Sequence, residues 1–314
     1  MFYGAISGSA PATVAAVGSM TIPLLMELGY KKDFSTAIVA VAGGLGVIIP
    51  PSIPFIMYAM ATGESVSDLF LAGIIPGLFD RSASYVLCIL SLQALWRGQG
   101  KDKMQRSLSL EARVFFSILK DSIWALLSPV IVLGCIYAGI ASPTEAAVIS
   151  VFYALFVSLF IYKSIKVKEI WGIMVEAMKT YAPILFILAA STAFSRLLTL
   201  MQVPQTVSAW ILAHFTNEIV LLIVINVFLL IVGMVMDTTP AILILSPILL
   251  PIVQSIGMNP IHFGAVMIVN LAIGFVTPPI GVNLFVASSL TDVPVMRIAK
   301  KAAPMIGYFL LALL

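Results

Sequence analysis

The sequence predicts an all-α integral membrane protein: a multi-span helical bundle with two inverted-topology repeats, re-entrant helical hairpins and broken helices. Three observations predict this fold. The 314 residues are 61% hydrophobic and only 10% charged, with a mean hydropathy of +1.11, whereas soluble domains are roughly a quarter charged. Long charge-free runs recur, and two polar breaks containing Gly or Pro lie inside apolar segments 228–229 residues apart. A chain this apolar needs the bilayer as its solvent.

The charge-free runs mark the predicted membrane spans. They cover residues 34–63, 82–96, 122–144, 146–162, 180–195, 219–236 and 238–291. A spanning helix needs about 20 mostly apolar residues. Most of the runs can therefore span, and the last must hold more than one element.

Basic residues predict the orientation of these spans. Fifteen of the 17 lie in four clusters: Lys31 and Lys32; Arg97, Lys101, Lys103, Arg106, Arg113 and Lys120; Lys163, Lys166, Lys168 and Lys179; Arg297, Lys300 and Lys301. Placing every cluster on the cytoplasmic side satisfies the positive-inside rule. The first broken segment then enters from the cytoplasm and the second from outside, so the two hairpins have opposite orientation.

The two breaks predict the tips of re-entrant hairpins over 1–30 and 218–258. The first break reads Ser-Gly-Ser-Ala-Pro-Ala-Thr over residues 7–13, and the second reads Met-Asp-Thr-Thr-Pro-Ala over residues 236–241. Ser9 and Thr239 are the expected helix caps, with Pro in the first turn that follows. Helix ends present unpaired carbonyls and N–H groups, so each tip can hold a hard cation and face an anion.

Asp237 is the only formal charge between Glu218 and Asp292. An ionised carboxylate at mid-bilayer costs several kcal/mol unless it is paired, and a bound sodium ion would compensate it. The alternative is that Asp237 only caps the helix that follows it. The two roles are compatible, and the sequence leaves both open.

Broken helices are predicted over 34–60 and 262–290, where Pro pairs delete N–H donors and Gly lets the backbone unwind. Ser52, Thr277 and Asn283 add side-chain oxygens there. A Pro pair can also be a kink without a ligand. Helix-breaking residues recur at an offset of 228, which favours a repeat: Pro23 and Pro251, Gly29 and Gly257, Gly46 and Gly274, Pro50-Pro51 and Pro278-Pro279, and Pro76 and Pro304.

The predicted repeats are residues 1–106 and 107–314. The first, which is incomplete, ends with a span over 75–96. The second begins with an interfacial helix and spans over 107–217 and ends with a truncated span over 304–314. Segments 107–121 and 167–179 are predicted amphipathic interfacial helices, with extension of a spanning helix as the alternative.

Two smaller features have structural interpretations. Ser142, Pro143 and Glu145 predict a capping box that opens a helix. Asn226 and Asn270 are expected to bond between helices.

Several other classes of protein are disfavoured. No basic run is interleaved with aromatic residues, so nucleic acid is not an expected partner. The two histidines, His214 and His262, are isolated, no H-E-x-x-H motif occurs, and an intramembrane enzyme is therefore disfavoured. No G-x-x-x-x-G-K-[ST] motif for nucleotide binding occurs. A non-catalytic assembly subunit is possible but leaves the polar tips unexplained.

With these residues in view, the chain resembles the large, DctM-like membrane subunit of the tripartite ATP-independent periplasmic (TRAP) transporters. The resemblance runs the whole length and rests on six motifs, at residues 7–13, 46–54, 68–77, 142–147, 236–240 and 277–283. It implies a sodium-coupled importer of organic acids in the bacterial inner membrane, working by an elevator motion. Family substrates include C4-dicarboxylates, sialic acid and other carboxylates.

The resemblance also implies partners: a small four-helix membrane subunit and a periplasmic substrate-binding protein, within a lipid bilayer. No cofactor is expected apart from sodium as the coupling ion. One alternative is a sodium–carboxylate symporter that acts without a binding protein. Another is an inactive fragment or assembly subunit. The family has helices upstream of the first hairpin, so the chain is expected to be N-terminally truncated.

Site residues follow from the resemblance. Sodium ligands are expected at both tips and at the adjacent broken helices: Ser7, Ser9, Gly43, Gly44, Gly46, Asp237, Thr238, Thr239, Gly274 and Thr277. The substrate is expected between the tips, near Ser9, Pro11, Ala12, Thr13, Ser52, Pro240 and Asn283. No metal other than sodium is expected.

Overall fold

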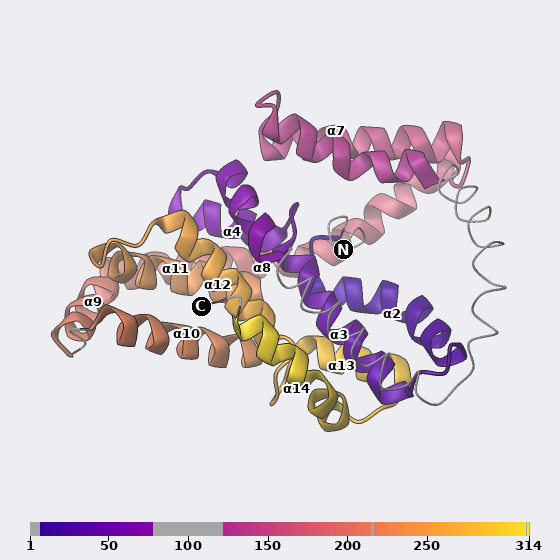
Figure 1. Ribbon diagram of the computed structural model, residues 1–314. Helices are drawn as coiled ribbons and strands as arrows, with labels where there is room; N and C mark the ends of the chain where they lie inside the picture. The colour runs from indigo at the N-terminus through magenta and orange to yellow at the C-terminus, as the bar shows by residue number, and fades with distance from the viewer. Residues whose placement is uncertain (1–6, 78–121, 215–216, 312, 314) are drawn as a thin grey trace. The chain divides into compact units, whose positions relative to one another are not determined.

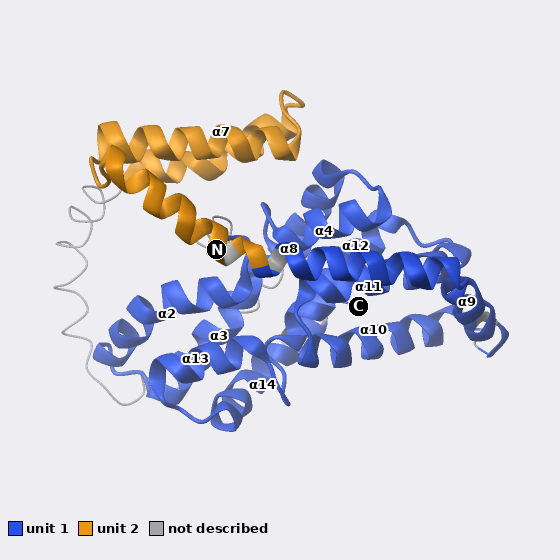
Figure 2. Cartoon of the chain, turned by 180° about the vertical axis from the view of Figure 1, so that it is seen from behind, with its two compact units in different colours: residues 1–84, 183–314 blue, residues 85–182 orange. Residues whose placement is uncertain are grey.

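The computed structural model describes residues 7–77, 122–214, 217–311 and 313, and these residues are helical with short connections. Six helical segments are long and apolar enough to cross a membrane: Ala10–Glu27, Lys32–Thr62, Pro143–Ile161, Val167–Leu200, Glu218–Val235 and Thr238–Ser255. The predicted multi-span helical fold is confirmed. The chain forms two compact units, residues 1–84 with 183–314 and residues 85–182 (Figure 2).

The larger unit contains both predicted hairpin tips and both predicted broken helices (Figure 1). Its N-terminal helices are α2 (Ala10–Glu27), α3 (Lys32–Ile48), α4 (Ile53–Thr62) and the helix Val66–Gly77. The end of α8 (Ile170–Leu200) follows, and then α9 (Val203–His214), α10 (Glu218–Val235), α11 (Thr238–Ser255), α12 (Pro260–Gly274), α13 (Val282–Thr291) and α14 (Val295–Leu311).

Helix boundaries recur at the offset of the predicted repeat. Helices α2 and α11 begin and end 228 residues apart, and so do the first residues of α3 and α12. The turns after α2 and α11 are the same. Gly29 (φ 91°) and Gly257 (φ 80°) adopt the left-handed conformation, which glycine enters without a side-chain penalty. The division into repeats 1–106 and 107–314, with inverted topology, stays a prediction.

The core of the larger unit is built around α3 and α12, which contact each other. Nearly every residue of α12 from Phe263 to Gly274 is buried. Helix α4 packs on α11, and α13 packs on α2, so each helix after a break contacts the other hairpin segment. Hydrogen bonds also join α4 to α12 and α13 to α3. Tyr58 Oη donates to Pro260 O (2.7 Å), and Asn283 Nδ2 donates to Ala40 O (3.1 Å).

Two boundaries differ from the sequence prediction. Helix α14 begins at Val295 rather than at 304, because it is amphipathic: Ile298 and Ala302 are buried while the lysines between them are exposed. A search for charge-free runs excludes such a helix. The helix Val66–Gly77 lies before and across the predicted start of the span 75–96, whose remaining residues fall outside the described part.

The smaller unit contains the helix Ser122–Tyr137, α7 (Pro143–Phe156), a π-helical turn (Val157–Ile161), a 3₁₀ turn (Val167–Glu169) and the beginning of α8. The predicted capping box is confirmed. Ser142 Oγ accepts from Glu145 N (3.4 Å), and Glu145 Oε2 accepts from Ser142 N (2.7 Å). Phe152 and Phe160 are exposed, as expected where lipid replaces water.

The predicted interfacial helix over 167–179 is not a separate element. Residues 170–179 continue into the apolar segment as one helix that ends at Leu200. This continuity favours the alternative, extension of a spanning helix, because no break or cap interrupts the helix at Lys179, the last residue of the predicted interfacial segment. The other predicted interfacial helix, 107–121, lies outside the described residues.

Candidate functional site

The first break gathers oxygen atoms at the start of α2. Gly8, with φ at 61°, turns the chain between Ser7 and Ser9. Ser7 Oγ lies 2.8 Å from Thr13 Oγ1 and donates to Ser9 O (3.1 Å). Ser9 O also accepts from Thr13 Oγ1 (2.8 Å). The predicted capping by the Ser9 side chain is wrong, and Thr13 closes the turn instead.

Helix α3 approaches this turn through glycines. A Cβ on Gly46 would lie 2.6 Å from Thr13 Oγ1 and 3.0 Å from Ser9 O, and one on Gly43 would overlap Val14. Both positions therefore require glycine for α2 and α3 to pack this closely. Gly44 faces another way, with its Cβ position 3.8 Å from Ala272 O of α12. The structure thus brings Ser7, Ser9, Thr13, Gly43 and Gly46 together and separates Gly44 from them.

The second break uses a carboxylate. Asp237 is the N-cap of α11, and its Oδ1 accepts from Thr239 N (3.3 Å) and Thr238 Oγ1 (3.1 Å). The predicted cap at Thr239 is wrong because the helix begins two residues earlier, at Thr238, which makes Pro240 its third residue. Thr238 is buried, whereas Asp237 is exposed. The capping role of Asp237 is confirmed, and its exposed carboxylate still has room for a second partner.

The second broken helix meets the first arm of its own hairpin. Helix α12 ends at Gly274, and a Cβ there would overlap the backbone of Gly233 in α10. Gly281 N, at the far end of the break, donates to Met234 O (3.3 Å). Thr277 Oγ1 donates to Ile273 O (2.8 Å) inside the break. Sequence reasoning missed Gly233, whose only signal is a glycine four residues before Asp237.

The predicted substrate residues fall into two groups. Thr13 is buried, and Ser52 and Asn283 are fully buried: Ser52 Oγ donates to Val47 O (2.5 Å) at the end of α3, and Asn283 links α13 to α3. Ser9, Pro11 and Pro240 are half-buried and Ala12 is exposed. Only the second group is open to a ligand in this conformation. The assignment of all these residues to substrate stays a prediction.

The two breaks are connected through the core. Gly44 of α3 and Ala272 of α12 are in contact, and each lies two residues before the glycine that faces its hairpin segment, Gly46 and Gly274. The predicted Asn pair also lies in this region: Asn270 Nδ2 of α12 donates to Asn226 Oδ1 of α10, which confirms the expected bond between helices. Within the described residues, no cluster of three or more His, Cys, Asp or Glu side chains could hold a metal ion.

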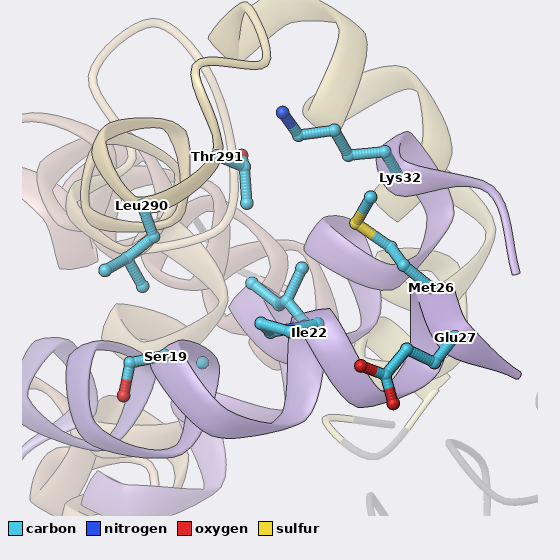
Figure 3. Close-up of a pocket in the computed structure, with 9 residues that line it drawn as sticks. Ser19, Ile22, Met26, Glu27, Lys32, Leu290 and Thr291 are labelled. Carbon is cyan, nitrogen blue, oxygen red and sulfur yellow. The ribbon is translucent and has the colours of Figure 1, made fainter.

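A separate pocket of about 520 Å³ lies at the other end of α2 (Figure 3). Ile22 and Leu290 contribute apolar surface, and Glu27 and Lys32 contribute opposite charges. None of the predicted site residues lines it. The pocket is therefore distinct from the two breaks.

Comparison with known proteins gives consistent matches. The family described as "Tripartite ATP-independent periplasmic transporter, DctM component" matches residues 1–314. The isethionate TRAP transporter permease protein DctMQ of Oleidesulfovibrio alaskensis is 44% identical over 100% of this chain and 48% of its own length. The C4-dicarboxylate TRAP transporter large permease protein DctM of Pseudomonas aeruginosa is 38% identical over 100% of this chain and 72% of its own length.

A third relative is the 2,3-diketo-L-gulonate TRAP transporter large permease protein YiaN of Escherichia coli, which is 37% identical over 92% of this chain and 67% of its own length. The chain spans about half the length of the Oleidesulfovibrio relative. The family match covers every motif at the two breaks. The chain therefore belongs to the DctM component family of the tripartite ATP-independent periplasmic transporters.

Proposed function

We propose that this chain is the permease part of a sodium-coupled secondary transporter that imports an organic acid across a bacterial inner membrane. The observation that carries the proposal is a polar helix start at each break, which lies next to the glycines of α3 at the first break and follows the Gly233–Gly274 contact by four residues at the second. The relatives support the substrate class, because isethionate, C4-dicarboxylates and 2,3-diketo-L-gulonate are all organic acids. The chain acts as a carrier and not as an enzyme.

The proposed coupling sites differ in charge. At the first break, the hydroxyls of Ser7 and Thr13 and the carbonyl of Ser9 offer neutral oxygens to a hard cation. At the second, the Asp237 carboxylate and the Thr238 hydroxyl add a formal negative charge. The first turns of α2 and α11 present N–H groups with partial positive charge, which suit a substrate carboxylate. A cation and an anion would therefore bind side by side, which is the basis of symport.

The proposed assembly is tripartite. The family description names a tripartite periplasmic system, and in it a small membrane subunit and a periplasmic binding protein would accompany the permease. The binding protein would deliver the acid, and the breaks would receive it with sodium. Uptake that continued without the binding protein would indicate a sodium–carboxylate symporter instead.

Asp237→Asn tests the function, because asparagine caps a helix as well as aspartate does but carries no charge. We expect sodium activation of uptake to need at least about tenfold more sodium, since the cation loses its one charged ligand. Thermal stability should stay near that of the unchanged protein. The assay is uptake into liposomes that contain the complete permease and its partners.

Two matched variants separate the two roles of Asp237. Asp237→Ala should lose both sodium affinity and about 1 kcal/mol of helix capping. Asn259→Ala, at the N-cap of α12, removes a cap that accepts from Ile261 N and His262 N, and it should lower stability alone. Unchanged sodium activation in Asp237→Asn would mean that Asp237 only caps α11.

A further inference from the structure

Helices α10 and α12 touch backbone to backbone at one place. A Cβ on Gly233 would lie 2.9 Å from both Leu271 Cα and Leu271 O and 3.3 Å from Gly274 Cα. A Cβ on Gly274 would fall on the backbone of Gly233. Neither residue can carry a side chain unless one helix moves, because backbone atoms cannot rotate out of the way. This contact sets the separation of the two helices.

Hydrogen bonds to α10 flank this contact on both sides, one from α12 and one from the residue before α13. Two turns earlier, Asn270 Nδ2 donates to Asn226 Oδ1, and Asn270 is buried. One residue after Gly233, Met234 O accepts from Gly281 N across the break. A side-chain bond, a glycine contact and a backbone bond therefore follow one another along α10, and the helix pair has a defined register.

The contact lies between the two halves of the second proposed sodium site. Gly233 lies four residues before Asp237, at the end of α10, and α10 carries the hairpin tip. Gly274 is the last residue of α12, where the broken helix exposes its carbonyls. The distance between the Asp237 tip and the Gly274 end of α12 therefore depends on how closely α10 approaches α12.

We propose that Gly233 is a positioning residue for the second sodium site: its lack of a side chain holds the Asp237 tip and the Gly274 end of α12 at the spacing that one cation requires. The inference rests on the proposed function, because it assigns a role within that site. Gly233 does not bind sodium. It acts through Gly274, whose carbonyl would be displaced if α10 moved outward.

The first break has no such contact among the described residues. Gly46, the counterpart of Gly274, faces the side chain of Thr13 and the carbonyl of Ser9 in α2, not another glycine. A threonine hydroxyl can rotate, whereas the Gly233 backbone cannot. The spacing of the second site is therefore the more sensitive of the two to added volume.

The test measures sodium-dependent thermal stabilisation of the complete permease, purified with its accompanying subunits, with choline chloride at equal ionic strength as the reference. This readout reports sodium binding without transport. For Gly233→Ala we expect the half-saturating sodium concentration to rise about tenfold, because a ligand displaced by less than 1 Å binds its ion poorly. The matched control is Gly264→Ala in α12, the helix that Gly233 contacts, where a Cβ would lie 2.6 Å from Tyr58 Cε1 and 2.9 Å from Leu69 Cδ2.

Gly264→Ala should lower the melting temperature without sodium, because it overpacks α12. It should leave the half-saturating sodium concentration within about twofold, because the added methyl group does not lie at the proposed site. An unchanged half-saturating concentration in Gly233→Ala would overturn the inference. So would an equal rise in both variants, which would indicate a general loss of packing.

Two further outcomes are informative. If Gly233→Ala does not fold, Asn226→Ala replaces it, because it loosens the same helix pair without adding volume. A rise of about threefold would support the inference and no rise would overturn it. If the unchanged protein shows no sodium-specific stabilisation, the proposed sodium coupling itself is wrong and the inference fails with it.

Discussion

The two breaks occupy corresponding places in the sequence, yet they are built differently. The first is closed by hydroxyl groups and the second by a carboxylate. At an offset of 228, the three residues that form the first network, Ser7, Ser9 and Thr13, correspond to Val235, Asp237 and Ala241. One charged side chain thus stands where the first break has a neutral network.

The glycines of the broken helices also have different neighbours. Gly46 faces the start of α2, the arm that follows its break, whereas Gly274 faces the end of α10, the arm that precedes its break. A recurring sequence landmark therefore does not imply a recurring site. The offset preserves where helices begin and end, and packing then decides which groups meet.

The largest expected difference between the breaks concerns these glycines. We expect Gly274→Ala to lower the free energy of unfolding by about 3 kcal/mol and Gly46→Ala by about 1–2 kcal/mol, because overpacking costs most where nothing can rotate away. Gly274 meets backbone, whereas Gly46 meets the rotatable Thr13 hydroxyl first. Thermal unfolding in detergent measures both variants. Equal losses would show that the two contacts are equally rigid.

An intermediate effect is expected at Thr13. Thr13→Val keeps the shape of the side chain but removes its contact with Ser7 Oγ and its bond to Ser9 O, so we expect a loss of about 1–2 kcal/mol. The control is Thr36→Val in α3, which is also buried but donates only to Lys32 O, one turn earlier. Its expected loss is smaller. Greater destabilisation by Thr36→Val would mean that the first network contributes little to folding.

The smallest effect on stability is expected at Asn283. Its Nδ2 bonds Ala40 O, but its Oδ1 is buried without a partner among the described residues. Asn283→Leu removes a bond together with an unpaired oxygen, so its net effect should be within about 1 kcal/mol. The corresponding position in the first half is the buried Phe55, which shows that an apolar side chain suits such a place.

Uptake assays with Asn283→Leu test the predicted substrate role separately. A fall in uptake together with intact thermal stability would favour contact with substrate or ion in another conformation. Unchanged uptake would restrict Asn283 to joining α13 and α3. Tyr58→Phe, which removes another long-range hydrogen bond, to Pro260 O, serves as the control for loss of a link between helices.

Much of the site was predictable because local signals specify it. Gly and Pro in apolar segments located both breaks, and the residues 228 positions apart located the corresponding helix starts. Ser7, Ser9 and Thr13 were all predicted site residues, but the hydrogen bonds among them were not predicted. The identity of the second cap was not anticipated: Asp237 and Thr239 are both good capping residues, and a shift of the helix start by two residues decides between them.

The sequence by itself determined that this chain is a helical membrane protein, because apolar content, charge-free length and helix-breaking residues act locally along the chain. It also determined the Ser142–Glu145 capping box and predicted that Asn226 and Asn270 bond between helices, although not that they bond each other. Only the tertiary structure decided that α4 packs on α11 and α13 on α2, and that Gly233 meets Gly274. The physical reason is that close packing depends on which surfaces fit in space, and no local pattern encodes a partner more than 30 residues away.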